Sequence, residues 1–191
     1  MKRISIVLSG AALLLWACNS ETKDSVEKAD STNMSKMDSP SVSQPIMADE
    51  ETSSFFVKAA NAGMTEVQIG EMAQQKATHD NVKSFAAMLI HDHTAVNEEA
   101  KSLAAQRNVS LPAAISEENQ KDMDDLAGKK VKDFDKAYIN EMIKRHNASI
   151  ELFEKSGDKI NDTEVKTFIN NTLPKIRMHL DSAKVILKTL K

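Results

Sequence analysis

Hydrophobic residues recur at intervals of three and four over most of the chain, the spacing that places them on one side of an α-helix. The pattern begins near Thr52 and continues almost to the last residue. Four long stretches carry it, and a helix is predicted for each: about 53–77, from 78–80 to about 108, about 131–156 and about 162–190. Aromatic residues make up only 4% of the chain, and glycine and proline are scarce, which favours helix over sheet. We therefore predict an all-α domain over residues 52–191.

The connections between these stretches predict how the helices are arranged. The first two helices are joined by a short turn, and the last two are separated near Gly157, so each pair is expected to form an antiparallel hairpin. The longest interruption covers residues 108–130. Pro112 stops regular structure there, Ser116 followed by two glutamates is typical of a helix start, and Gly128 of a helix end. The sequence thus predicts a four-helix bundle of two antiparallel hairpins joined by a segment with a short helix.

The first 18 residues, MKRISIVLSGAALLLWAC, have the pattern of an export signal: a basic start, an apolar run and Ala17 directly before a cysteine. The apolar run is too short to span a bilayer, which takes about 20 residues. The end of the stretch resembles the lipobox of bacterial lipoproteins, in which cleavage leaves the cysteine as a lipid-modified N-terminus. We expect a signal peptide over residues 1–17 and lipidation of Cys18. Trp16 departs from that motif, and an ordinary cleaved signal or an uncleaved anchor is the alternative.

Residues 18–51 are expected to form a flexible linker between the lipid and the bundle. They are rich in Ser, Asp, Lys and Glu and contain no aromatic residue, so they cannot bury enough apolar surface to offset the entropy of ordering. Together with Cys18 they predict a lipid-anchored protein of the cell envelope whose partner is the membrane. Asn19 after the cysteine favours the outer membrane, with the domain facing the periplasm or the cell surface. The net charge of −3 disfavours binding to nucleic acid.

Each of the four predicted helices carries one ionisable residue on its apolar side: Glu66, His93, His146 and His179. A buried carboxylate without partners costs several kcal/mol, so Glu66 is expected to lie near the histidines. The rise of 1.5 Å per helical residue places Glu66 level with His93. On the same rise, His179 is expected to lie deeper than His146 by roughly 5 to 10 Å. The second pair therefore fits a common cluster less well than the first.

Three arrangements of these four residues remain open. The imidazoles can donate hydrogen bonds to the carboxylate in a structural polar network. Alternatively, all four side chains can bind one divalent metal ion through nitrogen and oxygen, or they can occupy separate, unrelated sites. His79 and His91 lie off the apolar side and are expected to be exposed, and Asp92, about 100° around the helix from His93, is set aside.

Other chemistry is not indicated by the sequence. Met142 and Met178 lie near the histidines and raise the possibility of copper, but methionines at helical spacing are usually core residues. There is neither a nucleophile elbow nor a glycine-rich phosphate loop, so no catalytic residue is assigned and an enzyme is not favoured.

Four blocks of the sequence are similar to a known family: FVKAANAGMTEVQIGEMA, VKSFAAMLIHDHTAVNEEAKSLA, FDKAYINEMIKRHNASIELFE and LPKIRMHLDSA. They resemble the bacterial domain of unknown function 4142. The resemblance implies a ferritin-like four-helix bundle in an exported or lipid-anchored protein. The recurring polar positions of the family correspond to Glu66, His93, His146 and His179.

Ferritin-like di-iron proteins take a Glu from two helices and a Glu-x-x-His pair from the other two. Here the residues three before the histidines are Ile90, Ile143 and Ile176, which leaves too few carboxylates to bridge two irons. At most one mononuclear site is expected. Two hypotheses follow: a non-enzymatic envelope component with a binding or stress-related role, and a mononuclear metal-binding protein or metal-dependent oxidoreductase.

Overall fold

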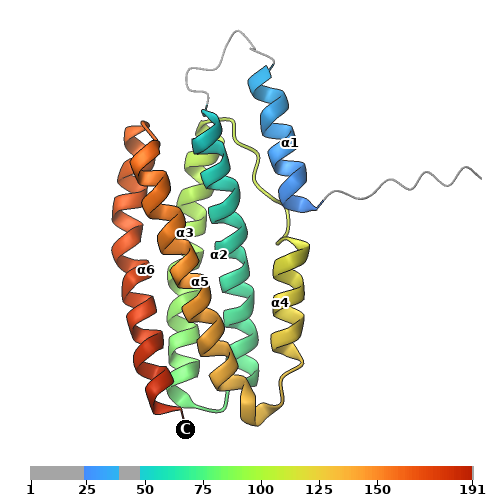
Figure 1. Ribbon diagram of the computed structural model, residues 1–191, viewed down its shortest axis with the longest axis vertical. Helices are drawn as coiled ribbons and strands as arrows, with labels where there is room; N and C mark the ends of the chain where they lie inside the picture. The colour runs from blue at the N-terminus through green and yellow to red at the C-terminus, as the bar shows by residue number, and fades with distance from the viewer. Residues whose placement is uncertain (1–23, 39–47, 191) are drawn as a thin grey trace, which may run out of the picture.

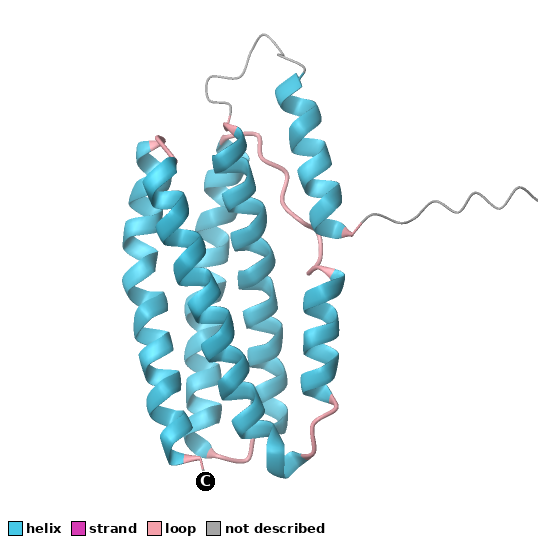
Figure 2. Cartoon of the chain, viewed as in Figure 1, coloured by secondary structure: helices cyan, strands magenta, loops and turns pink. Residues whose placement is uncertain are grey.

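The computed structural model describes residues 24–38 and 48–190, and those residues form six α-helices and no strand (Figure 2). The predicted all-α fold is therefore confirmed. None of the helices among the described residues is long and apolar enough to cross a membrane. The helices are α1 (Ser25–Asp38), α2 (Glu50–Lys76), α3 (Asp80–Gln106), α4 (Glu117–Ala127), α5 (Val131–Lys159) and α6 (Thr163–Thr189).

Helices α2, α3, α5 and α6 form the bundle, and both predicted hairpins are present (Figure 1). Helix α2 packs against α3 and α5, and α6 packs against α5 and α3. The segment that joins the hairpins runs back along the length of the bundle and includes α4, which packs on the outside of α2 (Figure 1). Because of this long crossover, α3 and α5 run in the same direction at diagonal corners.

Side-chain caps explain where the helices begin. Asp49 accepts a hydrogen bond from the backbone N–H of Thr52 at 2.8 Å, so α2 starts a few residues before the predicted Ser53. Ser116 caps α4 as the sequence predicts. Helix α5 continues past Gly157 to Lys159, and a Cβ added to Gly157 would lie 3.3 Å from Ile169 of α6. Gly157 therefore permits close packing of α5 against α6, and it does not end α5.

Helix α1 corrects the prediction that the whole of residues 18–51 is a flexible linker. Asn33 is buried and makes two hydrogen bonds with the backbone of Ser110. Its Nδ2 donates to the carbonyl of Ser110 at 2.9 Å, and its Oδ1 accepts from the N–H of Ser110 at 2.7 Å. Lys36 donates to the carbonyl of Asn108 at 2.8 Å. The prediction considered only apolar burial, whereas α1 is held by polar side chains that pair with the crossover backbone. The signal peptide and Cys18 lie outside the described residues.

Two apolar clusters fill the bundle, one toward each end. One includes Ile69, Phe85, Leu89, Tyr138 and Met142. The other includes Phe55, Phe56, Phe153, Phe168 and Ile176. On each bundle helix the ionisable residue lies between the residues that supply these two clusters. The polar side chains therefore form a layer within the hydrophobic core.

Candidate metal centre

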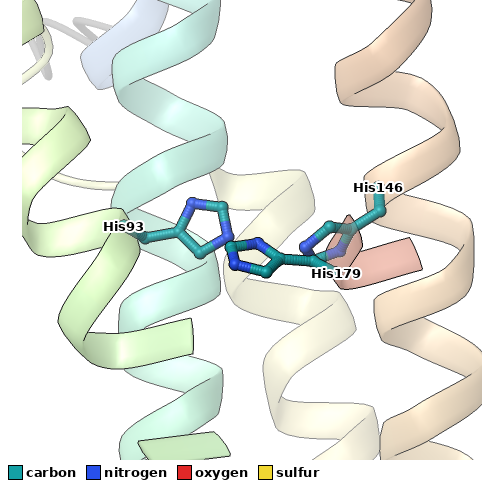
Figure 3. A group of neighbouring side chains, drawn as sticks. All are labelled: His93, His146 and His179. Carbon is teal, nitrogen blue, oxygen red and sulfur yellow. The ribbon is translucent and has the colours of Figure 1, made fainter. Parts of the chain in front are cut away.

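All four ionisable residues predicted to face inward are buried. Their exposed fractions are 2% for Glu66, 5% for His93, 0% for His146 and 1% for His179. The three histidines, which come from α3, α5 and α6, point toward one another (Figure 3). One ring nitrogen of each lies within 4.8 Å of one ring nitrogen of the others. The hypothesis of separate sites is therefore wrong for the histidines.

His179 lies level with His146, in contrast to the predicted offset of roughly 5 to 10 Å. The ring centroids of these two residues are 5.4 Å apart, close to the 5.4 Å and 5.2 Å that separate His93 from His146 and from His179. Side chains lean toward the N-terminus of their own helix. In the antiparallel pair α5–α6 this lean moves His146 away from the connecting turn and His179 toward it, which removes the difference in depth.

The outward nitrogen of each imidazole faces an acceptor. His146 Nδ1 lies 2.8 Å from the carbonyl oxygen of Met142, and His179 Nε2 lies 2.9 Å from Asp92 Oδ2. A carbonyl and a carboxylate can only accept, so both of these nitrogens carry the proton. His93 Nδ1 lies 3.2 Å from a carboxylate oxygen of Glu66, which favours the proton on that nitrogen too.

These contacts leave one nitrogen of each ring without a proton. The three nitrogens are Nε2 of His93, Nε2 of His146 and Nδ1 of His179, and all are buried without a hydrogen-bond partner among the described residues. Burial lowers the pKa of His146, although the negative charge of Glu66 acts to raise it. Burial also lowers the pKa of His179 to about 4, although Asp92 acts in the opposite direction. His146 and His179 are therefore neutral near pH 7, and each contributes a free lone pair.

A cation satisfies such an arrangement, since neutral imidazole is a metal ligand whose second N–H is commonly held by a carboxylate or a backbone carbonyl. A cavity of about 20 Å³ lies beside His93 and His179 and is lined by Glu66 and Asp92 as well. Roughly 10 to 15 Å³ of such volume accommodates one water-sized particle. The group formed by His93, His146 and His179 can thus hold one metal ion.

Glu66 belongs to the same cluster but lies on another side of the rings. Its Oε2 faces Nδ1 of His93 at 3.2 Å, and its Oε1 lies 3.7 Å from Nδ1 of His146. Both of these nitrogens differ from the unpartnered Nε2 of the same ring, and Oε1 has no hydrogen-bond partner among the described residues. A direct Glu66–metal bond stays a prediction, whereas its contact with His93 is part of the structure.

Asp92 is a residue of this centre that sequence reasoning missed. It was set aside because it lies about 100° around α3 from His93, and that rotation points it at α6, where His179 lies. Each bundle helix contacts two neighbouring helices. A polar residue beside the inward-facing residues can therefore indicate a contact with one of those neighbours. His91 is 85% exposed, as predicted. His79 is only partly exposed, and its side chain accepts a hydrogen bond from the N–H of Asn81 at the start of α3.

Arg107 is a second buried charge that the sequence did not reveal. It lies at the end of α3, where its guanidinium donates to both oxygens of Asp162 at 2.8 and 2.7 Å. It also donates to Glu164 at 2.8 Å and to the carbonyl of Leu103 at 3.0 Å. The hydrogen bonds to Asp162 raise the pKa of Arg107 and lower that of Asp162. This cluster holds the end of α3 against the start of α6.

The sequence profile of a known family matches residues 37–186, described as domain of unknown function (DUF4142). The chain belongs to this family. The match covers the four bundle helices almost completely, which confirms the resemblance stated from the four sequence blocks. Among curated proteins, no significant match is found.

Solved structures with a similar fold include a DUF305 fragment from Deinococcus radiodurans, with 12% identity and a TM-score of 0.68 over 75% of this chain and 99% of that one. Another is CopM in its Cu(II)-bound form, with 20% identity and a TM-score of 0.64 over 73% of this chain and 97% of that one. CopM in its Cu(I)-bound form gives 21% identity and a TM-score of 0.63 over 72% and 96%. At these identities the likeness concerns the helical-bundle fold.

Proposed function

We propose that this protein binds a single copper ion in the middle of its bundle through His93, His146 and His179. Two observations carry the proposal: one ring nitrogen of each histidine lies within 4.8 Å of one ring nitrogen of the others, and each ring has one buried nitrogen with no hydrogen-bond partner among the described residues. The opposite ring nitrogens face Glu66, the carbonyl of Met142 and Asp92. Such outer contacts fix the tautomer and orientation of metal-binding histidines.

The size of the cluster is compatible with one ion. Two nitrogens bound to the same ion are at most about 4.2 Å apart, which is twice a typical bond of ~2.1 Å. Three nitrogens arranged symmetrically around one ion at ~2.1 Å lie about 3.6 Å apart, and the ring nitrogens lie within 4.8 Å of one another, so inward movements of up to about 0.7 Å allow all three to bind. Side-chain rotations of that size need no change in the helices.

The donor set favours copper over other ions. Imidazole suits zinc, copper, iron and nickel, and among divalent ions of this series Cu(II) binds most tightly to a given site. The similar fold of CopM in two copper-bound forms is a second reason to test copper first. We infer storage or sequestration of the ion rather than catalysis, because the adjoining cavity of about 20 Å³ leaves room for one water-sized ligand and not for a substrate.

We propose further that the protein acts in the cell envelope, anchored to the outer membrane by a lipid on Cys18 and facing the periplasm or the cell surface. The support is the sequence of residues 1–18, with its basic start, apolar run and terminal cysteine. Mass spectrometry of the membrane fraction is expected to find diacylglycerol on Cys18. A soluble protein with a different N-terminus would contradict the anchor and leave the metal centre untouched.

Titration of the metal-free protein with Cu(II) and with Zn(II) tests the metal centre. One copper ion per chain is expected, with nitrogen hyperfine coupling in its electron paramagnetic resonance spectrum. His146→Ala and His179→Ala should each abolish stoichiometric binding, with retained helicity checked by circular dichroism. The control is His91→Ala, which removes an exposed imidazole that contacts Oδ1 of Asp92 and leaves the Oδ2 contact with His179 in place. Absence of stoichiometric copper, or equal loss in the control, would overturn the proposal.

A further inference from the structure

The outer face of the α2–α3 hairpin carries a groove of about 640 Å³ that ends under the crossover. Residues of α2, residues of α3 and the crossover segment Val109, Leu111 and Pro112 line it. The small cavity of the histidine centre lies on the other side of the same two helices. Asn97 lines both spaces, and among the described residues it is the one side chain common to the two. It therefore separates the groove from the centre.

Gly63 of α2 provides the place where the Asn97 side chain lies. A Cβ built on Gly63 would be 1.9 Å from Oδ1 of Asn97 and 2.9 Å from its Cγ. Only a glycine leaves room for an amide at that position. When the Asn97 side chain rotates outward, position 63 has no side chain that can fill the space. The gap between α2 and α3 then opens from the groove toward Glu66 and His93, which line the inner cavity.

Few interactions hold Asn97 in place. None of the hydrogen bonds found in the described part of the chain involves its amide. It is partly exposed, so water can replace any contact that it loses on turning outward. Rotation of a partly exposed side chain of this kind is fast, on the picosecond to nanosecond scale, compared with binding events. The residue can thus open and close the gap without a change in the helices.

Charge distinguishes the groove side of the cavity from its opposite side. The groove is lined by Glu71 and Glu98 with one lysine, Lys101, so its charged lining is acidic on balance. The opposite side of the cavity, between α3 and α6, is lined by Asp92 and Lys175. Asp92 is engaged by His179 there, and the Lys175 ammonium lies 3.9 Å from it. A cation is attracted to the acidic groove, whereas the charges of Asp92 and Lys175 on the opposite side offset each other.

We propose that the metal ion enters and leaves the histidine centre through the gap between α2 and α3, with Asn97 on Gly63 as its gate. The inference rests on the proposed metal binding and adds the path of the ion. It assigns Asn97 a role in the rate of exchange. The equilibrium occupancy is set by the three histidines.

The test compares rates with occupancy. Copper loading of the metal-free protein, and its removal by a chromophoric chelator, are followed by stopped-flow absorbance. Asn97→Ala is expected to speed both by about tenfold, the change for a barrier lowered by roughly 1.4 kcal/mol, while one ion per chain is still bound. Asn97→Leu, which fills the gap with a side chain of similar size that water does not draw outward, should slow both.

Two further variants make the test specific. Thr94→Ala alters the same groove without touching the inner cavity and should leave the rates unchanged. Lys175→Ala probes the side of the cavity between α3 and α6. Faster exchange in Lys175→Ala with unchanged exchange in Asn97→Ala would overturn the gate while leaving the metal centre intact. Failure of the unaltered protein to bind copper at equilibrium would overturn both proposals.

Discussion

Arg107 and the three histidines are both buried in this bundle, but their polar atoms are satisfied to different degrees. The guanidinium of Arg107 donates to two carboxylates and a backbone carbonyl, so the charge is neutralised and four of its five N–H donors are used. The histidine cluster has acceptors beside one nitrogen of each ring, while the other three ring nitrogens have no hydrogen-bond partner in the part of the chain that the structure describes. A polar cluster that only stabilises a fold satisfies its own groups. The histidine cluster instead has the composition of a site for a cation.

Removal of Arg107 is expected to have the largest effect on folding. Arg107→Ala leaves Asp162 without its partner and should lower the free energy of unfolding by about 3 kcal/mol, the lower end for a broken buried pair because both carboxylates keep contact with water. Urea unfolding measures this, and the stoichiometry of bound copper should be unchanged. Arg177→Ala, which removes a half-exposed pair with Glu154, is the control and should cost less than about 1 kcal/mol. Equal losses in the two variants would contradict the structural role of Arg107.

Copper should raise the free energy of unfolding by binding to the histidine cluster, and this gain should not depend on the Arg107 cluster. At a free ion concentration of 100 times Kd, a ligand that binds only the folded state adds about 2.7 kcal/mol to the free energy of unfolding. This gain should be absent in His179→Ala and present in Arg107→Ala. Thermal unfolding with and without copper checks both variants. A copper-dependent gain that survives His179→Ala would place the ion elsewhere.

Mild acid should destabilise the metal-free protein. The pKa of His179 is about 4 in the folded protein and 6.5 ordinarily, so below pH 6.5 the unfolded chain binds the proton that the folded chain does not. Stability is therefore lost as the pH falls from 6.5 toward 4, by about 2 kcal/mol at pH 5 from this residue, and the lowered pKa of His146 adds in the same direction. Unfolding midpoints at pH 7.5 and 5 measure the loss.

The slope of that pH profile also identifies the groups responsible. His179→Gln should flatten it, and His91→Gln, at an exposed position, is the control. Greater stability at pH 5 would instead show that protonated histidines pair with Glu66. The histidine cluster would then be a structural ion-pair cluster, as the Arg107 cluster is.

Asp92 is expected to act on the metal centre through His179. Asp92→Ala removes the acceptor that holds Nε2–H and should weaken copper binding by about tenfold, because Nδ1 is then no longer kept free for the ion. Asp92→Asn retains an oxygen acceptor and should restore most of the affinity. Nitrogen-15 spectra of the imidazole report the tautomer directly. An unchanged tautomer in Asp92→Ala would remove this residue from the centre.

The smallest effect is expected at helix α1, which lies outside both clusters. Asn33→Ala removes two hydrogen bonds to Ser110 and should cost about 1 kcal/mol of local stability. Hydrogen exchange of the Ser110 amide, which donates to Asn33, is the measurement, and it should speed up while the bundle amides do not change. Thr32→Ala, on the exposed side of α1, is the control. Unchanged exchange at Ser110 would show that the docking of α1 depends on other contacts.

Most of the fold could be predicted from local patterns. The spacing of apolar residues located all four bundle helices, and Ser116 and Gly128 marked the short helix. Helix α1 could not be predicted in this way, because its buried residues are only Ala29 and Asn33 and its attachment depends on backbone groups of the crossover, which is distant in sequence. A polar helix with distant partners leaves no periodic apolar signal.

The sequence by itself determined that one ionisable residue from each bundle helix is buried, because helical periodicity decides which side of a helix faces the core. The tertiary structure decided what those residues do. Packing of α3 beside α6 brought Asp92 to His179, and the opposed lean of side chains in antiparallel helices made the histidines level. Which nitrogen carries a proton depends on the acceptor behind each ring, and those acceptors are positioned by helix packing. For that reason the inward nitrogens, and with them the candidate metal centre, emerge only from the folded chain.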